Sequence, residues 1–162
     1  MSISQKIYVV SGPIASGKST TCKILRDKIK NSVLADGDEI KAAMTFKPEI
    51  EWSEQIRSTW QSIISTAKSA ISDGYDVVID YVVENELEML KQEFQQFDLK
   101  YIVLLPSKSI LKKRLRDRGD TEYATRQLKL IEVISSNPEN DDYIIDNSAL
   151  TAEETAQVIL DE

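Results

Sequence analysis

The sequence predicts an α/β fold built on a parallel β-sheet. Short apolar runs alternate along the chain with longer amphipathic stretches, which is the pattern of strands joined by helical crossovers. The first apolar run leads into a glycine-rich loop and then into a helical pattern, so the chain opens with a strand, a loop and a helix in that order. A length of 162 residues fits one domain, spanning 1–162, with one sizeable core.

The expected elements follow from the apolar runs and from the residues that interrupt them. We expect strands at 6–10, 32–36, 76–83, 100–105 and 143–146. Helices are expected to begin near Lys18 and Asp38, to span 53–73, 84–97, 107–118 and 121–136, and to begin again after Thr151, which opens a capping box. Gly37 breaks the second strand, and Gly74 and Gly119 end helices.

Composition excludes several classes of function. The net charge of −7 argues against nonspecific binding to nucleic acid or to an anionic membrane. The absence of histidine removes the commonest general base and the commonest zinc ligand. The one cysteine, Cys22, excludes an intrachain disulfide and is expected to be a small buried residue. We see neither a signal peptide nor a membrane-spanning run, so a cytoplasmic enzyme is expected.

The loop after the first strand carries the motif G-x-x-x-x-G-K-[ST], the phosphate-binding P-loop. Its glycines permit a tight turn whose inward N–H groups, with the N-terminus of the next helix, bind phosphates. Lys18 would reach the β- and γ-phosphates of ATP, Ser19 would bind Mg²⁺ and Thr20 would lie near the α-phosphate. The predicted nucleotide-binding residues in this loop are Gly12, Pro13, Ile14, Ala15, Ser16, Gly17, Lys18, Ser19 and Thr20.

Acidic side chains follow the second and third predicted strands, where a parallel sheet places its ligand crevice. Asp38 would accept the proton of a substrate hydroxyl, and Asp36 or Asp80 would hold Mg²⁺ through water. The alternatives are helix capping or turn formation by Asp36 and Asp38, and a solvated strand end at Asp80. One capping aspartate accounts for one member of the pair Asp36 and Asp38, but not for both.

Positive charge gathers on the helix predicted at 107–118 and continues at Arg126. Arg114 and Arg118 share one face of that helix, so both would reach one triphosphate. The alternative is a solvated helix face on which the arginines pair with neighbouring carboxylates, and this is the expected role of Lys112 and Lys113.

Taken in order along the chain, these motifs resemble those of the small P-loop kinases. The set is similar to the branch of the chloramphenicol phosphotransferases and, more loosely, to gluconate, shikimate and adenylyl-sulfate kinases. The resemblance implies a three-layer fold with a five-stranded sheet in the order 2-3-1-4-5, a helical substrate cap at about 37–74 and an arginine-rich lid at about 107–136.

The resemblance also implies roles for individual residues. Asp38 would orient or deprotonate the acceptor hydroxyl and Asp36 would lie near Mg²⁺. Arg114 would pack on adenine and Arg118 would contact phosphates, while Arg126 would be a further arginine of the lid. The loop 146–150, with Asn147 and Ser148, would border the adenine.

The sequence departs from this family at the acceptor side. A one-residue shift leaves Asp38 and Glu39 competing for the role of base, and the segment 45–54 is too short for the antibiotic-binding insert. Between 40 and 60 the cations are Lys41, Lys47 and Arg57, which favours a neutral hydroxylated acceptor over a nucleoside monophosphate. The pocket for this acceptor would be lined by the aromatic residues Trp52, Trp60 and Tyr81. Core packing is the main expectation for Trp60.

These observations predict an ATP- and Mg²⁺-dependent kinase that phosphorylates a hydroxyl of a small metabolite or antibiotic. The substrate-binding residues would be Asp36, Asp38, Arg57, Tyr81 and Arg126. A nucleotide-dependent regulatory module and a polynucleotide 5′-hydroxyl kinase are the alternatives, and the acidic charge opposes the second. We expect a monomer or a weak homodimer, with no membrane or nucleic-acid partner.

Overall fold

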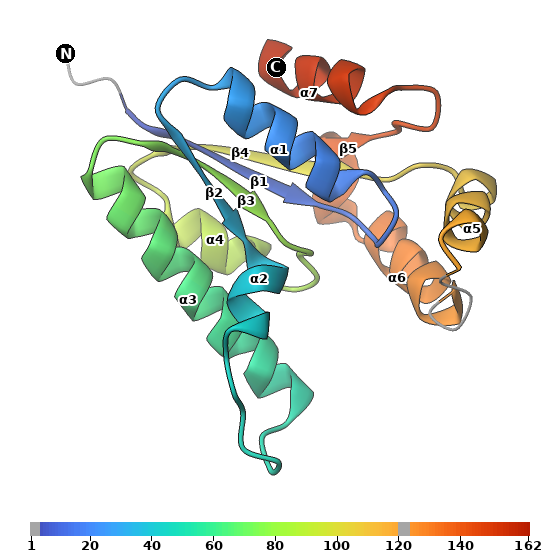
Figure 1. Ribbon diagram of the computed structural model, residues 1–162, viewed down its shortest axis with the longest axis horizontal. Helices are drawn as coiled ribbons and strands as arrows, with labels where there is room; N and C mark the ends of the chain where they lie inside the picture. Colours follow the sequence, from blue (N-terminus) through green and yellow to red (C-terminus); the bar gives the residue numbers. More distant parts are fainter. Residues whose placement is uncertain (1–3, 120–123) are drawn as a thin grey trace.

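A parallel sheet of five strands organises the computed structural model, which describes residues 4–119 and 124–162 (Figure 1). The strands are β1 (Lys6–Ser11), β2 (Ser32–Asp36), β3 (Asp76–Asp80), β4 (Asp98–Leu104) and β5 (Ile144–Ile145). Their order is β2-β3-β1-β4-β5 and every pairing is parallel, which confirms the predicted fold class and strand order.

Helices cover both faces of the sheet (Figure 1). One face carries α1 (Lys18–Lys28) and α7 (Ala152–Asp161). The other carries α3 (Trp52–Ser72), α4 (Leu87–Glu93) and α6 (Ala124–Ser136). The short helix α2 (Gly37–Ala42) follows β2, α5 (Lys108–Asp117) follows β4, and the 3₁₀ helix η2 (Pro138–Tyr143) precedes β5. None of the described helices is long and apolar enough to cross a membrane.

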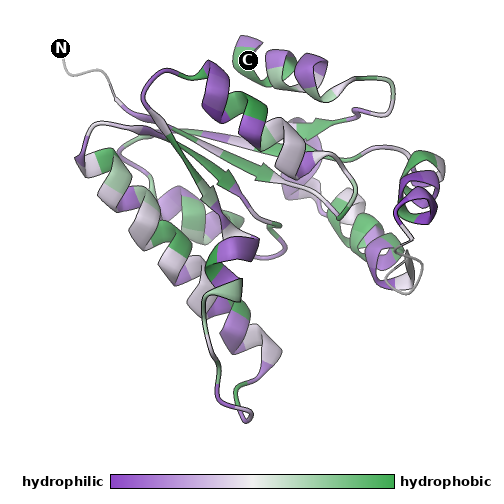
Figure 2. Cartoon of the chain, viewed as in Figure 1, coloured by the Kyte–Doolittle hydropathy of each residue, from purple (hydrophilic) through white to green (hydrophobic). Residues whose placement is uncertain are grey.

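The strands bury both of their faces, as a sheet between two helical layers requires. Along β1, Ile7 and Val9 face the layer of α3, whereas Tyr8 and Val10 face α1 and α7. In Figure 2 the strands at the centre are mostly hydrophobic, while the helices carry hydrophilic residues on their outer faces. Cys22 is fully buried in the second of these layers, as expected.

The segment after β3 differs from the expectation. We expected a strand to residue 83 and a helix over 84–97, whereas β3 ends at Asp80 and α4 spans only seven residues. The Glu86 carboxylate accepts hydrogen bonds from the N–H groups of Glu84 and Asn85, which forms a turn in place of a first helical turn. Val83 N–H donates to Ser11 Oγ over 2.8 Å, so this loop is attached to the end of β1.

The last strand also differs from its predicted bounds, and the reason is local. Asn137 accepts a hydrogen bond from Glu139 N–H and begins η2, so the strand predicted at 143–146 is reduced to two residues. The predicted capping box at Thr151 is present, with both reciprocal hydrogen bonds to Glu154. The predicted lid includes residues 120–123, which lie outside the described residues.

Gly37 begins α2 rather than merely ending β2. Asp36 is the N-cap residue, and its Oδ1 accepts hydrogen bonds from Asp38 and Glu39 N–H. A Cβ at Gly37 would lie 2.2 Å from Tyr81 Cδ2, closer than atoms approach in real structures. The glycine therefore allows α2 to start against the Tyr81 ring, and this contact fixes where the Asp38 backbone lies.

We expect Gly37→Ala to lower the free energy of unfolding by about 1–3 kcal/mol, because the added methyl group overpacks the contact with Tyr81. Urea unfolding of Gly37→Ala, Tyr81→Ala and the double variant measures the coupling. The cost of the double variant should be smaller than the sum of the single costs, since truncation of Tyr81 removes the clash. Additive costs would contradict this account.

Candidate active site

The P-loop has the backbone geometry of an anion-binding nest. Gly12 has φ +151°, and a Cβ there would lie 2.5 Å from Leu104 O. Gly17 has φ +90° and is the N-cap residue of α1, whose first N–H groups have no acceptor within the helix. These groups face a hollow of about 450 Å³ beside the predicted lid. It is lined by Pro13, Ile14, Ala15, Gly17, Lys18, Ser19, Thr20, Asp38 and Arg118.

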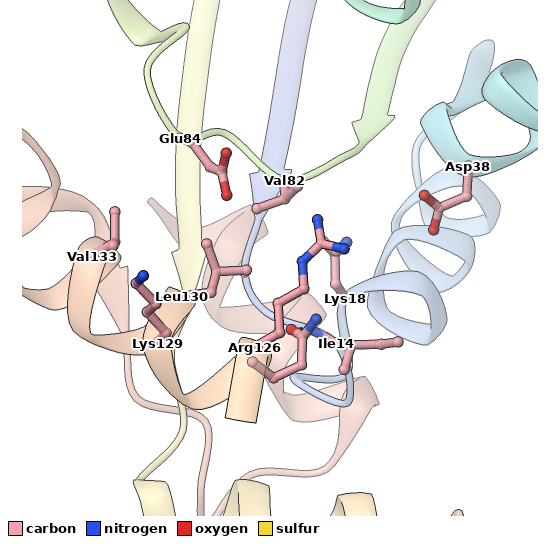
Figure 3. Close-up of a pocket in the computed structure, with 11 residues that line it drawn as sticks. Ile14, Lys18, Asp38, Val82, Glu84, Arg126, Lys129, Leu130 and Val133 are labelled. Carbon is pink, nitrogen blue, oxygen red and sulfur yellow. The ribbon is translucent and has the colours of Figure 1, made fainter. Parts of the chain in front are cut away.

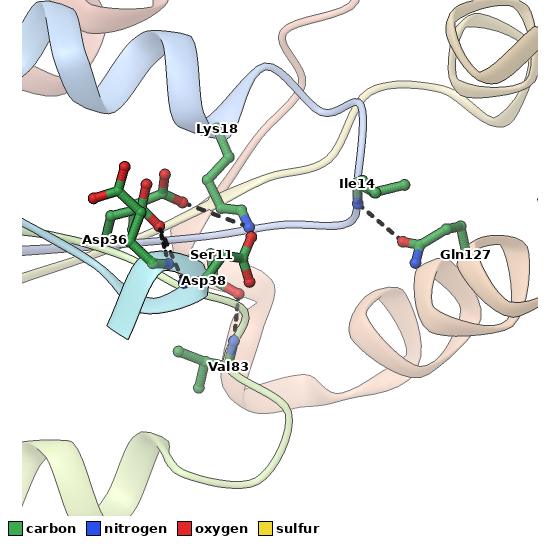
Figure 4. A network of polar contacts seen from close by, with 9 residues as sticks. Ser11, Ile14, Lys18, Asp36, Asp38, Val83 and Gln127 are labelled. Carbon is green, nitrogen blue, oxygen red and sulfur yellow. Dashed lines mark hydrogen bonds and ion pairs between the residues drawn. The ribbon is translucent and has the colours of Figure 1, made fainter. Parts of the chain in front are cut away.

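Lys18 and Asp80 form a largely buried ion pair next to this hollow. Lys18 Nζ lies 3.5 Å from Asp80 Oδ1, and the Asp80 side chain is only 3% exposed (Figure 4). Burial raises the pKa of Asp80, while the Lys18 ammonium and the nearby Ser19 hydroxyl act in the opposite direction. Lys18 is therefore held at the end of β3, within the cation-binding region predicted from the sequence.

The oxygen atoms near Lys18 fit a magnesium ion. Mg²⁺ is commonly held by one or two protein ligands together with phosphate oxygens and water. The Ser19 hydroxyl lies near Asp80, and Asp36 lies opposite Asp80 in the β2–β3 pairing. In the described part of the chain, no three acidic or cysteine side chains form a complete metal cage. The residues near Lys18 offer one hydroxyl and two carboxylates, and Mg²⁺ binds oxygen ligands of this kind.

Asp36 and Asp38 have different surroundings in the structure, although they are two residues apart. Asp36 caps α2 through Oδ1, so the capping alternative accounts for this residue. Asp38 is exposed, and its carboxylate makes no hydrogen bond or ion pair to residues within the described ranges. It lines the P-loop hollow and also the clefts on the far side of Lys18, whereas Glu39 lines none of these cavities.

A second hollow, of about 370 Å³, lies beside the P-loop and is lined by Arg114 of α5 and by Arg118, the residue just after this helix. Arg114 Nη1 donates to Ala15 O over 3.1 Å, and Asn147 Nδ2 donates to Ser16 O over 2.7 Å. Among the described residues, the buried atoms Thr21 Oγ1 and Asn147 Oδ1 have no hydrogen-bond partner, although both residues line this hollow. The hollow therefore brings the P-loop, Arg114 and the loop that carries Asn147 to one place, as the sequence predicted for the nucleotide site.

On the other side of Lys18 lie two adjoining cavities of about 360 and 260 Å³, the larger of which is drawn in Figure 3. We call them together the acceptor cleft, after the role that the sequence predicts for several residues that line them. Arg126 and Glu84 project into it from α6 and from the loop after β3. The larger cavity has apolar walls at Leu130 and Val133. Both cavities share six residues, which are Ile14, Asp38, Val82, Glu84, Arg126 and Gln127.

The smaller cavity has a cationic wall built on Trp52. The Lys41 ammonium lies 3.5 Å from the centre of a Trp52 ring, and the Arg126 guanidinium carbon lies 5.1 Å from it. Partial burial lowers the pKa of Lys41; Arg126 acts in the same direction and Asp38 opposes it. Cation–π attraction helps to hold the two like charges close together.

Other predicted site residues have different surroundings. Tyr81 lines the smaller cavity but is 4% exposed, and its ring packs edge-on against Trp60, with centroids 5.3 Å apart. Trp60 is fully buried, as its core role predicts.

Arg57 is exposed on α3 and lines none of the cavities described above. Ser148 accepts a hydrogen bond from Ser107 N–H and bonds to Asp146, so it holds the loop 146–150 in shape.

Sequence reasoning did not single out Gln127, and it did not predict that Lys41 would meet Trp52 and Arg126, two residues that it had assigned to the substrate site. Gln127 Oε1 accepts a hydrogen bond from Ile14 N–H over 2.9 Å (Figure 4), across 113 positions of sequence. Lys41 and Trp52 meet Arg126 although they lie on separate elements. The proximity of Gln127 to Arg126 in the sequence was the one local signal, and it does not specify a contact with the P-loop.

Comparisons with known proteins show a family and a group of relatives for this chain. A family model described as an AAA domain matches residues 9–142. Guanylate kinase from Prochlorococcus marinus subsp. pastoris is 25% identical over 96% of this chain and 95% of its own length. Guanylate kinase from Mycoplasma genitalium is 23% identical over 97% of this chain and 76% of its own length.

Solved structures show the same fold. The APS kinase of Mycobacterium tuberculosis in complex with AMPPNP and APS matches with a TM-score of 0.71 and 14% identity, covering 99% of this chain and 98% of that chain. A sugar kinase from Janibacter sp. HTCC2649 matches with a TM-score of 0.66 and 14% identity, covering 98% of this chain and 95% of that chain.

The raised pKa of Asp80 predicts a pH-dependent stability in the nucleotide-free protein. The folded state binds more protons than the unfolded state above the ordinary aspartate pKa of about 3.9, so the free energy of unfolding falls as the pH rises through this window. Asp80→Asn cannot titrate. Its stability relative to the wild type should therefore increase with pH, as measured by urea unfolding in EDTA. A relative decrease would show that Lys18 lowers the pKa more than burial raises it.

Proposed function

The chain belongs to the AAA domain family, and from this premise we propose that it transfers the γ-phosphoryl group of ATP to a small acceptor in the acceptor cleft. It is a small P-loop kinase that uses ATP with Mg²⁺. One observation carries the proposal about the acceptor. Ile14, Lys18 and Asp38 line both the P-loop hollow and the larger cavity of the acceptor cleft, so a donor phosphate and an acceptor would meet beside them.

The proposed mechanism depends on positioning and electrostatic stabilisation. The N–H groups of the P-loop and the Lys18 ammonium would bind the β- and γ-phosphate oxygens. Ser19, Asp36 and Asp80 would hold Mg²⁺, which would supply positive charge beside the phosphates. Arg114 and Arg118 border the nucleotide hollow on the other side of the P-loop. Their charges would stabilise the triphosphate and help exclude water.

Asp38 is proposed as the residue that orients the acceptor hydroxyl and accepts its proton. Its backbone is fixed by the Asp36 cap, while its carboxylate remains available on the cleft side. Glu39 has the same chemistry but lines none of the cavities at the site. This difference supports Asp38 over Glu39, the two residues that the sequence left in competition.

A phosphate-bearing acceptor is the second candidate, and two observations favour it. The curated relatives are named guanylate kinases, whose name gives a guanylate as the acceptor. Arg126, which the sequence analysis assigned to the substrate site, joins Lys41 at the wall of the smaller cavity, so two cations border it. Within the described part of the chain neither cation forms a salt bridge, so an anionic acceptor group would find both available.

Asp38→Asn should lower kcat by about 10²- to 10⁴-fold with little change in ATP affinity, because it removes a base outside the P-loop. Glu39→Gln is the matched change one residue away and should leave kcat close to that of the wild type. Steady-state kinetics and isothermal titration with AMPPNP separate turnover from binding. A large loss in Glu39→Gln, with none in Asp38→Asn, would assign the base to Glu39.

The acceptor class is tested with compounds that differ in one anionic group. ATP consumption with Mg²⁺ is measured for glucose against gluconate and guanosine against GMP, with hydroxylated antibiotics and a 5′-hydroxyl oligonucleotide also included. Lys18→Ala provides the blank. Turnover of neutral members supports a hydroxyl acceptor, whereas turnover of GMP alone supports a nucleotide acceptor. Nucleotide binding without turnover of any acceptor would favour the regulatory alternative.

A further inference from the structure

Two consecutive residues of α6 reach opposite sides of the site. Gln127 Oε1 accepts the Ile14 N–H of the P-loop over 2.9 Å. Arg126 places its guanidinium carbon 5.1 Å from the centre of a Trp52 ring at the start of α3. Successive side chains on a helix point about 100° apart, so one end of α6 can contact both the P-loop and the start of α3.

The N–H group bound by Gln127 lies where a nucleotide acts. Ile14 is one of the residues shared by the P-loop hollow and the acceptor cleft. In Figure 4 the Gln127 side chain points from α6 toward the Ile14 backbone, at the bend of the loop. A hydrogen bond of this kind weakens once its heavy atoms separate by more than about 3.5 Å, so a small shift of the loop would be felt by Gln127.

The opposite end of α6 is held firmly by the sheet. Asn140 Nδ2 donates to Ile134 O over 3.0 Å, and Tyr101 Oη donates to Asn140 Oδ1 over 3.0 Å. Ile131 and Ile134 are buried on the same helix. Because these contacts fix its C-terminal half, movement of α6 would be greatest near Arg126 and Gln127.

We propose that Gln127 is a positioning residue that couples the P-loop to Arg126. The hydrogen bond to Ile14 sets the N-terminal half of α6, and α6 in turn sets the contact of Arg126 with Trp52. Binding of a nucleoside triphosphate in the P-loop therefore changes the surroundings of Trp52 in the acceptor cleft. The inference rests on the proposed function only for the identification of this cleft with the acceptor.

Trp52 supplies a readout that needs no acceptor. It is 50% exposed, whereas Trp60, the other tryptophan, is fully buried. Acrylamide quenching of tryptophan fluorescence is measured on the full chain during titration with Mg²⁺ and AMPPNP. The same titration of Trp52→Phe identifies the part of the signal that belongs to Trp52. Nucleotide binding is measured in parallel by isothermal titration.

The wild type should show a change in Trp52 quenching when AMPPNP binds. Gln127→Met has a side chain of similar length without the amide oxygen, so the change should disappear. Nucleotide affinity should fall by no more than about fivefold, the factor that corresponds to one net hydrogen bond of about 1 kcal/mol. Gln157→Met makes the same substitution on α7 at an exposed position and should behave as the wild type.

Further variants separate positioning from a general structural effect. Gln127→Glu keeps an acceptor oxygen and should retain the Trp52 response, while Gln127→Asn is one methylene group shorter and should lose it. In an Arg126→Met background, Gln127→Met should have no additional effect on quenching. A response of wild-type size in Gln127→Met and Gln127→Asn, or a wild type that binds AMPPNP without any Trp52 response, would overturn the proposal. Failure to find an acceptor would count against the proposed function alone.

Discussion

The parallel register of the three strands β2, β3 and β1 is the constraint on which the site depends. Val10 lies opposite Asp80 in the β1–β3 pairing, and Asp36 lies opposite Asp80 in the β2–β3 pairing. All strands run in one direction, so their C-terminal ends meet at one edge and bring the P-loop to the acidic residues. A shift of one residue in either pairing would turn these side chains toward the opposite face of the sheet.

Burial at this edge gives the site its electrostatic character. The Asp80 side chain is only 3% exposed, so its ionisation is costly. The Lys18 ammonium offsets part of this cost. This arrangement holds Lys18 near the strand ends before a nucleotide binds. A bound cation and triphosphate would redistribute the same charges without requiring the sheet to move.

The acceptor cleft combines elements that fold for unrelated reasons. The turn at Glu86 and the bond from Val83 to Ser11 fix the loop after β3. The cap of α2 places Asp38, and the Asn140 contacts orient α6. The result is a local cationic wall in a chain of net charge −7. The same cavity is also lined by the carboxylates Asp38, Glu84 and Glu86, so side chains of both charges border it.

The sequence by itself determined the fold class, the P-loop and the polar residues at the strand ends, because each depends on local patterns of glycine, apolar residues and charge. It also identified Thr151 as a cap and Trp60 as a core residue. Only the tertiary structure showed that Asp36 caps α2 while Asp38 lines the cleft. It also showed that Tyr81 is largely buried and that Gln127 accepts a hydrogen bond from Ile14. These outcomes depend on contacts between segments far apart in the chain, and side-chain spacing along one helix or strand carries no information about which distant backbone group will lie opposite it.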